Sequence, residues 1–122
     1  MIQLAKEKTH AVNFHTPTYI GSLRKVSKYA KALNTKATEQ LETSNEADTA
    51  LATALKEVAT EADALRLEAN TYVASRDGDH YLYYTHGADA VKNAREQRVD
   101  SLADTYSEIL RKYQDICKQY SI

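Results

Sequence analysis

The fold is decided by the stretch from Pro17 to Ser75, which reads PTYIGSLRKVSKYAKALNTKATEQLETSNEADTALATALKEVATEADALRLEANTYVAS. It contains no Gly or Pro after Gly21, so no residue beyond that glycine is a strong helix breaker. Apolar residues recur at heptad spacing, which is typical of the buried seam of a helix and not of a strand. The seam comprises Tyr19, Leu23, Val26, Ala30, Leu33, Ala37, Ser44, Ala47 and Leu51, then, after a stutter, Leu55, Val58, Ala62, Leu65, Ala69 and Tyr72.

The connection near Ser44 leaves two architectures open. Because the heptad phase passes through Ser44 without a slip and no Gly or Pro marks a turn, the primary prediction is one unbroken helix over about 17–75. Thr43 and Glu46 nevertheless have the spacing of a capping box, which would end one helix near Leu41 and begin another. The first reading gives an elongated antiparallel coiled-coil hairpin. The second gives a slender three-helix bundle with a break near Ser44.

The rest of the chain is predicted to complete a single all-α domain over 17–122. Residues 1–16 form an N-terminal tail or arm, and Thr16 followed by Pro17 is a typical helix start. Residues 76–79 predict a turn, in which Gly78 ends the first helix. The last helix is expected over about 80–120, where the apolar heptad positions are Val99, Leu102, Tyr106, Ile109, Tyr113, Ile116 and Tyr120.

The predicted seam is lean in large aliphatic side chains, which favours partner helices. Burying an Ala methyl contributes about 0.8 kcal/mol, whereas a buried Leu or Ile contributes about 1.5–3 kcal/mol. An unbroken first helix would also outreach the last one, leaving its first turns without an internal partner. We therefore expect a second copy or another protein to dock on those turns and on a Tyr cluster at the hairpin tip. The predicted partner-binding residues are Tyr19, Leu23, Arg24, Lys25, Val26, Lys28, Tyr81, Tyr83 and Tyr84.

The charges of the chain are segregated along its length, although its net charge is only −1. The chain is basic over 6–36 and mostly acidic over 39–68. Same-sign residues recur at helical-neighbour spacing and repel each other within one helix, as in the pairs Arg24–Lys28, Glu39–Glu42 and Glu42–Glu46. These same-sign pairs would be stabilised if an oppositely charged surface lay beside them. The simpler interpretation is that they lie on a face of the helix that is exposed to water. The acidic block would repel phosphates, so no nucleic-acid partner is expected.

No catalytic residue, cofactor or metal site is predicted, so we expect a non-enzymatic protein. The sequence has no nucleophile elbow, glycine-rich phosphate loop or metal triad. Its histidines, His10, His15, His80 and His86, include no i, i+4 pair, and the single Cys117 rules out an internal disulfide. With no apolar run of spanning or signal-peptide type, the chain is predicted to be intracellular, in the cytoplasm or alternatively in an organelle interior.

The function predicted from these features is associative. The first hypothesis is a helical scaffold or accessory subunit that binds other helices in a larger or homo-oligomeric assembly. A second is a peripheral membrane module similar to the long bent bundles of the BAR type, which the acidic block over 39–68 disfavours. A third is a helical adaptor or chaperone for one client protein.

Overall fold

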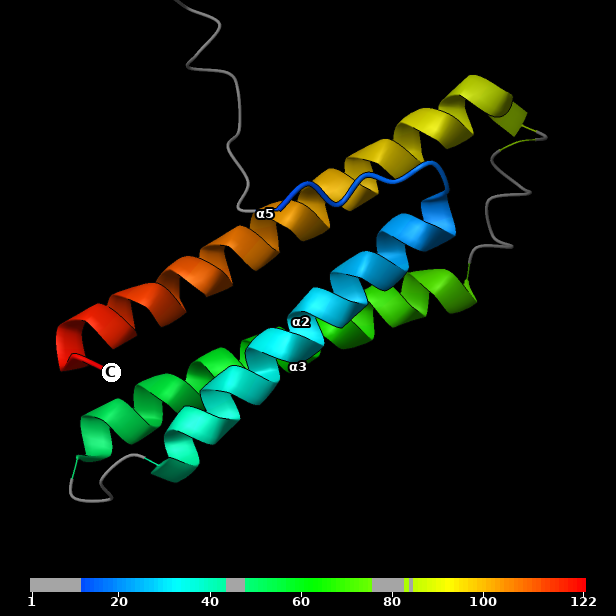
Figure 1. The fold of residues 1–122 in the computed structure, drawn as a ribbon. Coiled ribbons are helices and arrows are strands. Elements are labelled where there is room, and N and C mark those ends of the chain that lie inside the picture. The colour runs from blue at the N-terminus through cyan, green and yellow to red at the C-terminus, as the bar shows by residue number, and fades with distance from the viewer. Residues whose placement is uncertain (1–11, 44–47, 76–82, 84) are drawn as a thin grey trace, which may run out of the picture.

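The protein is all-α, and its helices pack as a bundle in the computed structural model, which describes residues 12–43, 48–75, 83 and 85–122. Three helices lie in this part of the chain: α2 (Tyr19–Thr43), α3 (Thr49–Ala74) and α5 (Ala88–Tyr120). Helices α2 and α3 lie side by side and run in opposite directions, while α5 packs on both and runs parallel to α2 (Figure 1). The order is therefore up, down, up.

The prediction of one unbroken helix over 17–75 is wrong, and the alternative with a break near Ser44 describes the chain. Helix α2 ends at Thr43, and α3 begins at Thr49. Asp48 caps α3, because its carboxylate accepts a hydrogen bond from the Leu51 amide at 3.0 Å. The Thr43 hydroxyl instead donates to the Glu39 carbonyl of its own helix at 3.1 Å, and Glu46 lies outside the described residues. Folding back lets each half of the stretch bury its seam against the other.

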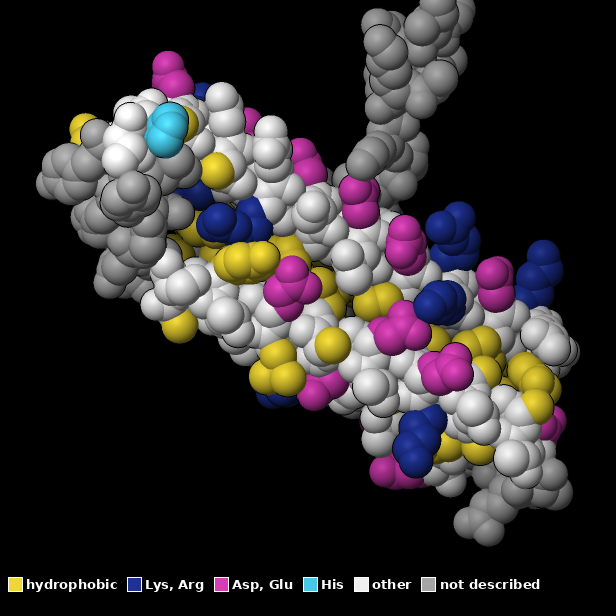
Figure 2. Space-filling view, turned by 180° about the vertical axis from the view of Figure 1, so that it is seen from behind, with side chains coloured by type: hydrophobic (Ala, Val, Ile, Leu, Met, Phe, Trp, Pro, Cys, Tyr) yellow, Lys and Arg dark blue, Asp and Glu magenta, His cyan; other side chains and the backbone are white. Residues whose placement is uncertain are grey.

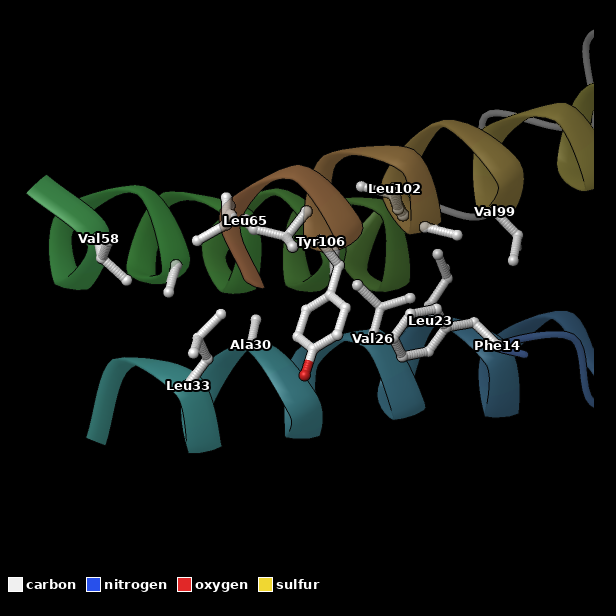
Figure 3. Packing of buried hydrophobic residues seen from close by; sticks show 14 of the residues in the cluster. Phe14, Leu23, Val26, Ala30, Leu33, Val58, Leu65, Val99, Leu102 and Tyr106 are labelled. Carbon is white, nitrogen blue, oxygen red and sulfur yellow. The ribbon is translucent and has the colours of Figure 1, made fainter. Parts of the chain in front are cut away.

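The predicted seam supplies most of the core of the bundle, but its Tyr19 and Tyr72 are only partly buried, and its Ser44 and Ala47 lie outside the described residues. On α2 and α3 the buried side chains are those of Leu23, Val26, Ala30, Leu33, Ala37, Leu51, Leu55, Val58, Ala62, Leu65 and Ala69. Helix α5 adds Val91, Val99, Leu102, Tyr106 and Ile109. Figure 3 shows Val99, Leu102 and Tyr106 in the core, whereas the later positions of the predicted pattern, Tyr113, Ile116 and Tyr120, are only partly buried. The fully buried alanines of α2 and α3 let the two backbones approach closely, since only a methyl group separates them.

The segment before α2 belongs to the core, although the sequence places it in a tail. Phe14 is 1% exposed and is among the largest fully buried side chains. Its ring makes edge-to-face contacts with Tyr29 of α2 at 5.4 Å and with Tyr106 of α5 at 5.3 Å, between ring centroids. Tyr29 and Tyr106 also meet edge to face at 6.1 Å. This aromatic triad, defined as Phe14, Tyr29 and Tyr106, fills the space between α2 and α5.

The aromatic triad gives the bundle a predicted sensitivity to alkaline pH. Burial, and then the neighbouring Tyr29, raise the pKa of the Tyr106 hydroxyl above its ordinary value of 10.0. Because the folded chain holds this proton more tightly than the unfolded chain, the stabilising contribution is complete below about pH 10. It is lost as the pH rises through the folded pKa.

We therefore expect the free energy of unfolding, measured with urea, to fall as the pH rises above about 10, and to fall less steeply in the variant Tyr106→Phe. The exposed Tyr83 provides the control, since Tyr83→Phe should leave the slope unchanged. An equal slope in all three proteins would contradict the role given to Tyr106.

Residues 83, 85 and 86 are helical, as the sequence predicts, and Gly87 separates them from α5. Gly87 precedes it with φ +88°, a left-handed conformation that side chains rarely adopt, and no side chain caps the helix there. The Gly87 amide donates to the Tyr83 carbonyl at 2.8 Å. The predicted turn at 76–79 and the predicted helix start near residue 80 lie outside the described residues.

The bundle covers the apolar stripe that was expected to need a partner. Leu23 and Val26 are both 0% exposed and pack with Phe14 and with residues of α3 and α5 in a single cluster. The expectation of an uncovered stripe depended on an unbroken first helix that reached beyond the last one. Since α2 folds back on α3 and lies beside α5, that reason for an obligate partner no longer applies.

Candidate functional site: a cationic and aromatic groove

A groove of about 430 Å³ lies between the amino-terminal part of α5 and the chain leading into α2. Its floor is formed by the buried side chains of Ser22, Val91 and Val99. Its walls and rim carry aromatic, charged and polar residues together with Pro17 and Ala88; the former are His15, Thr16, Tyr19, Tyr83, Lys92, Arg95 and Glu96. The groove is therefore mostly apolar at its base, and its α5 side carries two cations and one carboxylate.

Hydrogen bonds fix the chain that leads into α2. The Thr18 hydroxyl accepts from the Gly21 amide at 3.0 Å, so Thr18, and not the predicted Thr16, caps this helix. The Thr16 amide donates to the buried Ser22 hydroxyl at 2.8 Å, and that hydroxyl donates to the Thr18 carbonyl at 3.1 Å. A methyl group at Gly21 would come within 2.6 Å of the Thr18 hydroxyl oxygen, which explains the glycine in this first turn.

Two arginines of α5 hold the aromatic wall of the groove. The Arg95 guanidinium lies 4.7 Å from the centroid of the Tyr19 ring, and Arg98 lies 4.6 Å from that of Tyr72 on α3. Arg98 Nη1 also donates to the Tyr19 hydroxyl at 2.6 Å. Figure 2 shows Lys or Arg side chains directly beside hydrophobic ones near this end of the bundle. These cation–π contacts join all three helices and orient Tyr19.

Two polar contacts anchor the segment before α2 to the bundle. His15 Nε2 lies 2.7 Å from an Asp100 carboxylate oxygen on α5. The Lys25 ammonium donates to the Asn13 carbonyl at 2.7 Å. Together with the burial of Phe14, these contacts hold one wall of the groove in place.

The composition of the groove suits an elongated ligand that is apolar on one side and anionic on the other. Val91, Val99 and Tyr19 offer apolar contact area, while Lys92 and Arg95 carry positive charge and Glu96 a negative one. Within the described residues, no group of three or more His, Cys, Asp and Glu side chains is arranged to hold a metal ion.

The structure divides the predicted partner-binding residues among several places. Tyr19 and Tyr83 both line the groove. Arg24 and Lys28 are exposed on α2, whereas Lys25 bonds to the preceding segment. Leu23 and Val26 are core residues, so their prediction as exposed docking residues is corrected by their burial. Tyr81 and Tyr84 lie outside the described residues.

The sequence prediction missed the residues that α5 contributes to the groove. Lys92, Arg95 and Glu96 interrupt the apolar pattern between Val91 and Val99, and this interruption was the available signal. Where polar residues replace apolar ones along the buried face of a helix, that part of the face is in contact with water or a ligand and not with the core. The pattern cannot show that Tyr19, remote in sequence, lies opposite them.

Comparisons with family models, with curated proteins and with solved structures give no match to this chain. In the described part of the chain, every helix is too short or too polar to cross a membrane. The class of protein that the fold defines is an all-helical bundle, and the groove is a feature of its surface.

Proposed function

We propose that the protein is a non-enzymatic helical accessory subunit, and that its groove binds a short acidic and apolar segment of a partner protein. The observation that carries this proposal is the groove itself, in which Tyr19 and Tyr83 meet Lys92 and Arg95 over an apolar floor. Aromatic and Arg side chains around a pocket are enriched at the energetic centres of protein interfaces. The remaining exposed residues of α5 are mostly polar, which makes the groove the distinctive feature of this helix.

The fixed geometry of the groove supports binding of a partner. Arg95 lies over the ring of Tyr19, and the Tyr19 hydroxyl accepts a hydrogen bond from Arg98, so the wall needs little rearrangement when a ligand arrives. Such preorganisation lowers the entropy cost of association. The heptad-spaced core of α2 and α3 is also compatible with antiparallel coiled-coil packing, which would make the bundle a rigid scaffold.

A membrane-binding role receives less support. The exposed face of α2 carries Arg24, Lys28 and Lys31, but Glu39 and Glu42 continue the same face. Carboxylates at that position repel anionic headgroups, so the face has no continuous basic surface. A binding role toward protein is therefore the better proposal, as a scaffold subunit or as an adaptor for one client.

The proposal is tested by nuclear magnetic resonance titration of the full chain with a probe peptide, acetyl-Glu-Phe-Glu-Leu-amide. We expect shifts of the backbone signals of Tyr19, Lys92 and Arg95, and about three- to tenfold weaker binding by Lys92→Glu, since a cation is replaced by an anion. The variant Lys118→Glu makes the same charge change elsewhere on α5 and should bind as the unmodified chain does. A control peptide in which both Glu residues are replaced by Lys should bind more weakly, and equal affinity for the two peptides would refute the proposal. Signal shifts that leave out Tyr19, Lys92 and Arg95 would refute it too.

A further inference from the structure

The outer face of α2 carries a stripe of charges in a definite order. Steps of three or four residues connect its members, so they lie along one face of the helix. All are exposed, and they lie opposite the buried seam of the same helix. We call this set the α2 stripe, and it consists of Arg24, Lys28, Lys31, Thr35, Glu39 and Glu42.

The charges of the α2 stripe are complementary to those of a second, antiparallel copy of the same stripe. Lys31 and Glu39 each lie four positions from Thr35, and Lys28 and Glu42 each lie seven positions from it. When two copies of α2 lie antiparallel about a two-fold axis at Thr35, Lys31 of each faces Glu39 of the other. Lys28 of each likewise faces Glu42 of the other, so every contact between charges is attractive.

The charges of the α2 stripe have no ion-pair partner within the described residues of the bundle. The ion pairs there join His15 to Asp100, Arg66 to Asp63 and Lys112 to Glu61. Along one copy of α2 the neighbouring charges of the stripe have the same sign and repel each other. A second copy would place an opposite charge beside Lys28, Lys31, Glu39 and Glu42.

The middle of the α2 stripe permits close approach of two helices. Thr35 and the neighbouring Ala32 are exposed and small. Helices with small residues at the crossing point pack about 8 Å apart, which brings flanking Lys and Glu side chains within reach of each other. A uniformly acidic partner helix would match only the basic half of the stripe, so the chain's own copy is the better fit.

We propose that two copies of this chain associate through the α2 stripe, as an antiparallel two-fold pair centred on Thr35. Exposed ion pairs contribute little individually and are screened by salt. The pair is therefore weak and dissociates at high ionic strength. None of its residues lines the groove, so self-association and partner binding are separable properties of the chain.

Sedimentation equilibrium of the full chain over a concentration series tests whether the pair forms. We expect a monomer–dimer equilibrium in low salt and at least a tenfold weaker association in about 1 M salt, where the screening length falls to about 3 Å. A monomer at every concentration in low salt, or a dimer that salt does not weaken, would overturn the proposal.

Charge reversal tests the pairing itself. The double variant Lys28→Glu, Lys31→Glu has an all-acidic stripe apart from Arg24, and Glu39→Lys, Glu42→Lys has an all-basic one. Each should be monomeric alone, while an equimolar mixture should dimerise at least tenfold more tightly than either variant alone. The variant Arg111→Glu, Lys118→Glu makes the same charge change on exposed positions of α5 and should self-associate normally. A mixture that stays monomeric would contradict the pairing.

A disulfide trap tests the position of the two-fold axis. In a Cys117→Ser background, Thr35→Cys should form a covalent dimer on mild oxidation, because two-fold related residues on the axis come within disulfide distance. Ala64→Cys, on the exposed face of α3, is the matched control and should form at most a fifth as much dimer under the same conditions. Equal yields from the two variants would reject the axis at Thr35. Circular dichroism of each variant should show unchanged helix content, since every substituted position of the stripe is exposed.

Discussion

Replacing Phe14 with alanine is expected to destabilise the protein by about 3–5 kcal/mol, because the change empties a fully buried aromatic site. The Phe14 ring contacts Tyr29 of α2 and Tyr106 of α5, so its loss leaves a cavity between two helices. Edge-to-face pairs of this kind contribute about 0.5–1.5 kcal/mol beyond the burial of area. Urea unfolding followed by circular dichroism at 222 nm, in the far-ultraviolet region where helices absorb, gives the measurement.

The same experiment shows whether the segment before α2 is an integral part of the fold. Phe14→Leu keeps most of the buried volume and should cost less than Phe14→Ala. Tyr83→Ala removes an aromatic ring that is 54% exposed and should change stability by less than about 0.5 kcal/mol. A loss of under about 1 kcal/mol for Phe14→Ala would mean that the bundle folds without this segment.

Replacing Leu23 with alanine is expected to cost about 2–5 kcal/mol, the range measured for fully buried leucines. Leu23 is 0% exposed and belongs to the same cluster as Val26, Phe14 and the core residues of α3 and α5. A leucine on an uncovered docking stripe would instead have little effect on folding of the isolated chain. Thermal and urea unfolding of the monomer, at a protein concentration too low for self-association, separates these two cases.

The exposed Leu67 of α3 provides the matched control for this substitution. Leu67 is 51% exposed, so Leu67→Ala removes the same atoms from a site that is already half in water. We expect a change of less than about 1 kcal/mol there. Similar losses at the two leucines would show that Leu23 is not part of a closed core.

The core of each helix could be predicted from sequence because the signal is local. Leu23, Val26 and Leu33 on one helix, and Leu55, Val58 and Leu65 on another, recur at the helical period and are buried. Periodicity reports which face of a helix avoids water. It does not show which other helix or segment packs against that face.

The break between α2 and α3 was harder to predict, because both outcomes satisfy the same heptad pattern. The sequence around Ser44 has no Gly or Pro, and the cap that α3 uses is Asp48 and not the Thr43 of the predicted capping box. A hairpin of two helices buries both seams at once, whereas a single long helix would leave one exposed. The gain from burial therefore decides the break, and that gain is a property of the whole chain.

The amino-acid sequence by itself determined that this chain is helical and which residues of its helices avoid water, since both follow from spacing along a single helix. Only the tertiary structure decided that the helices fold into a bundle, that Phe14 completes the core, and that Tyr19 meets Arg95 and Lys92 in one groove. Those contacts join residues that are far apart in sequence. They depend on how several faces are buried together, which no local pattern encodes.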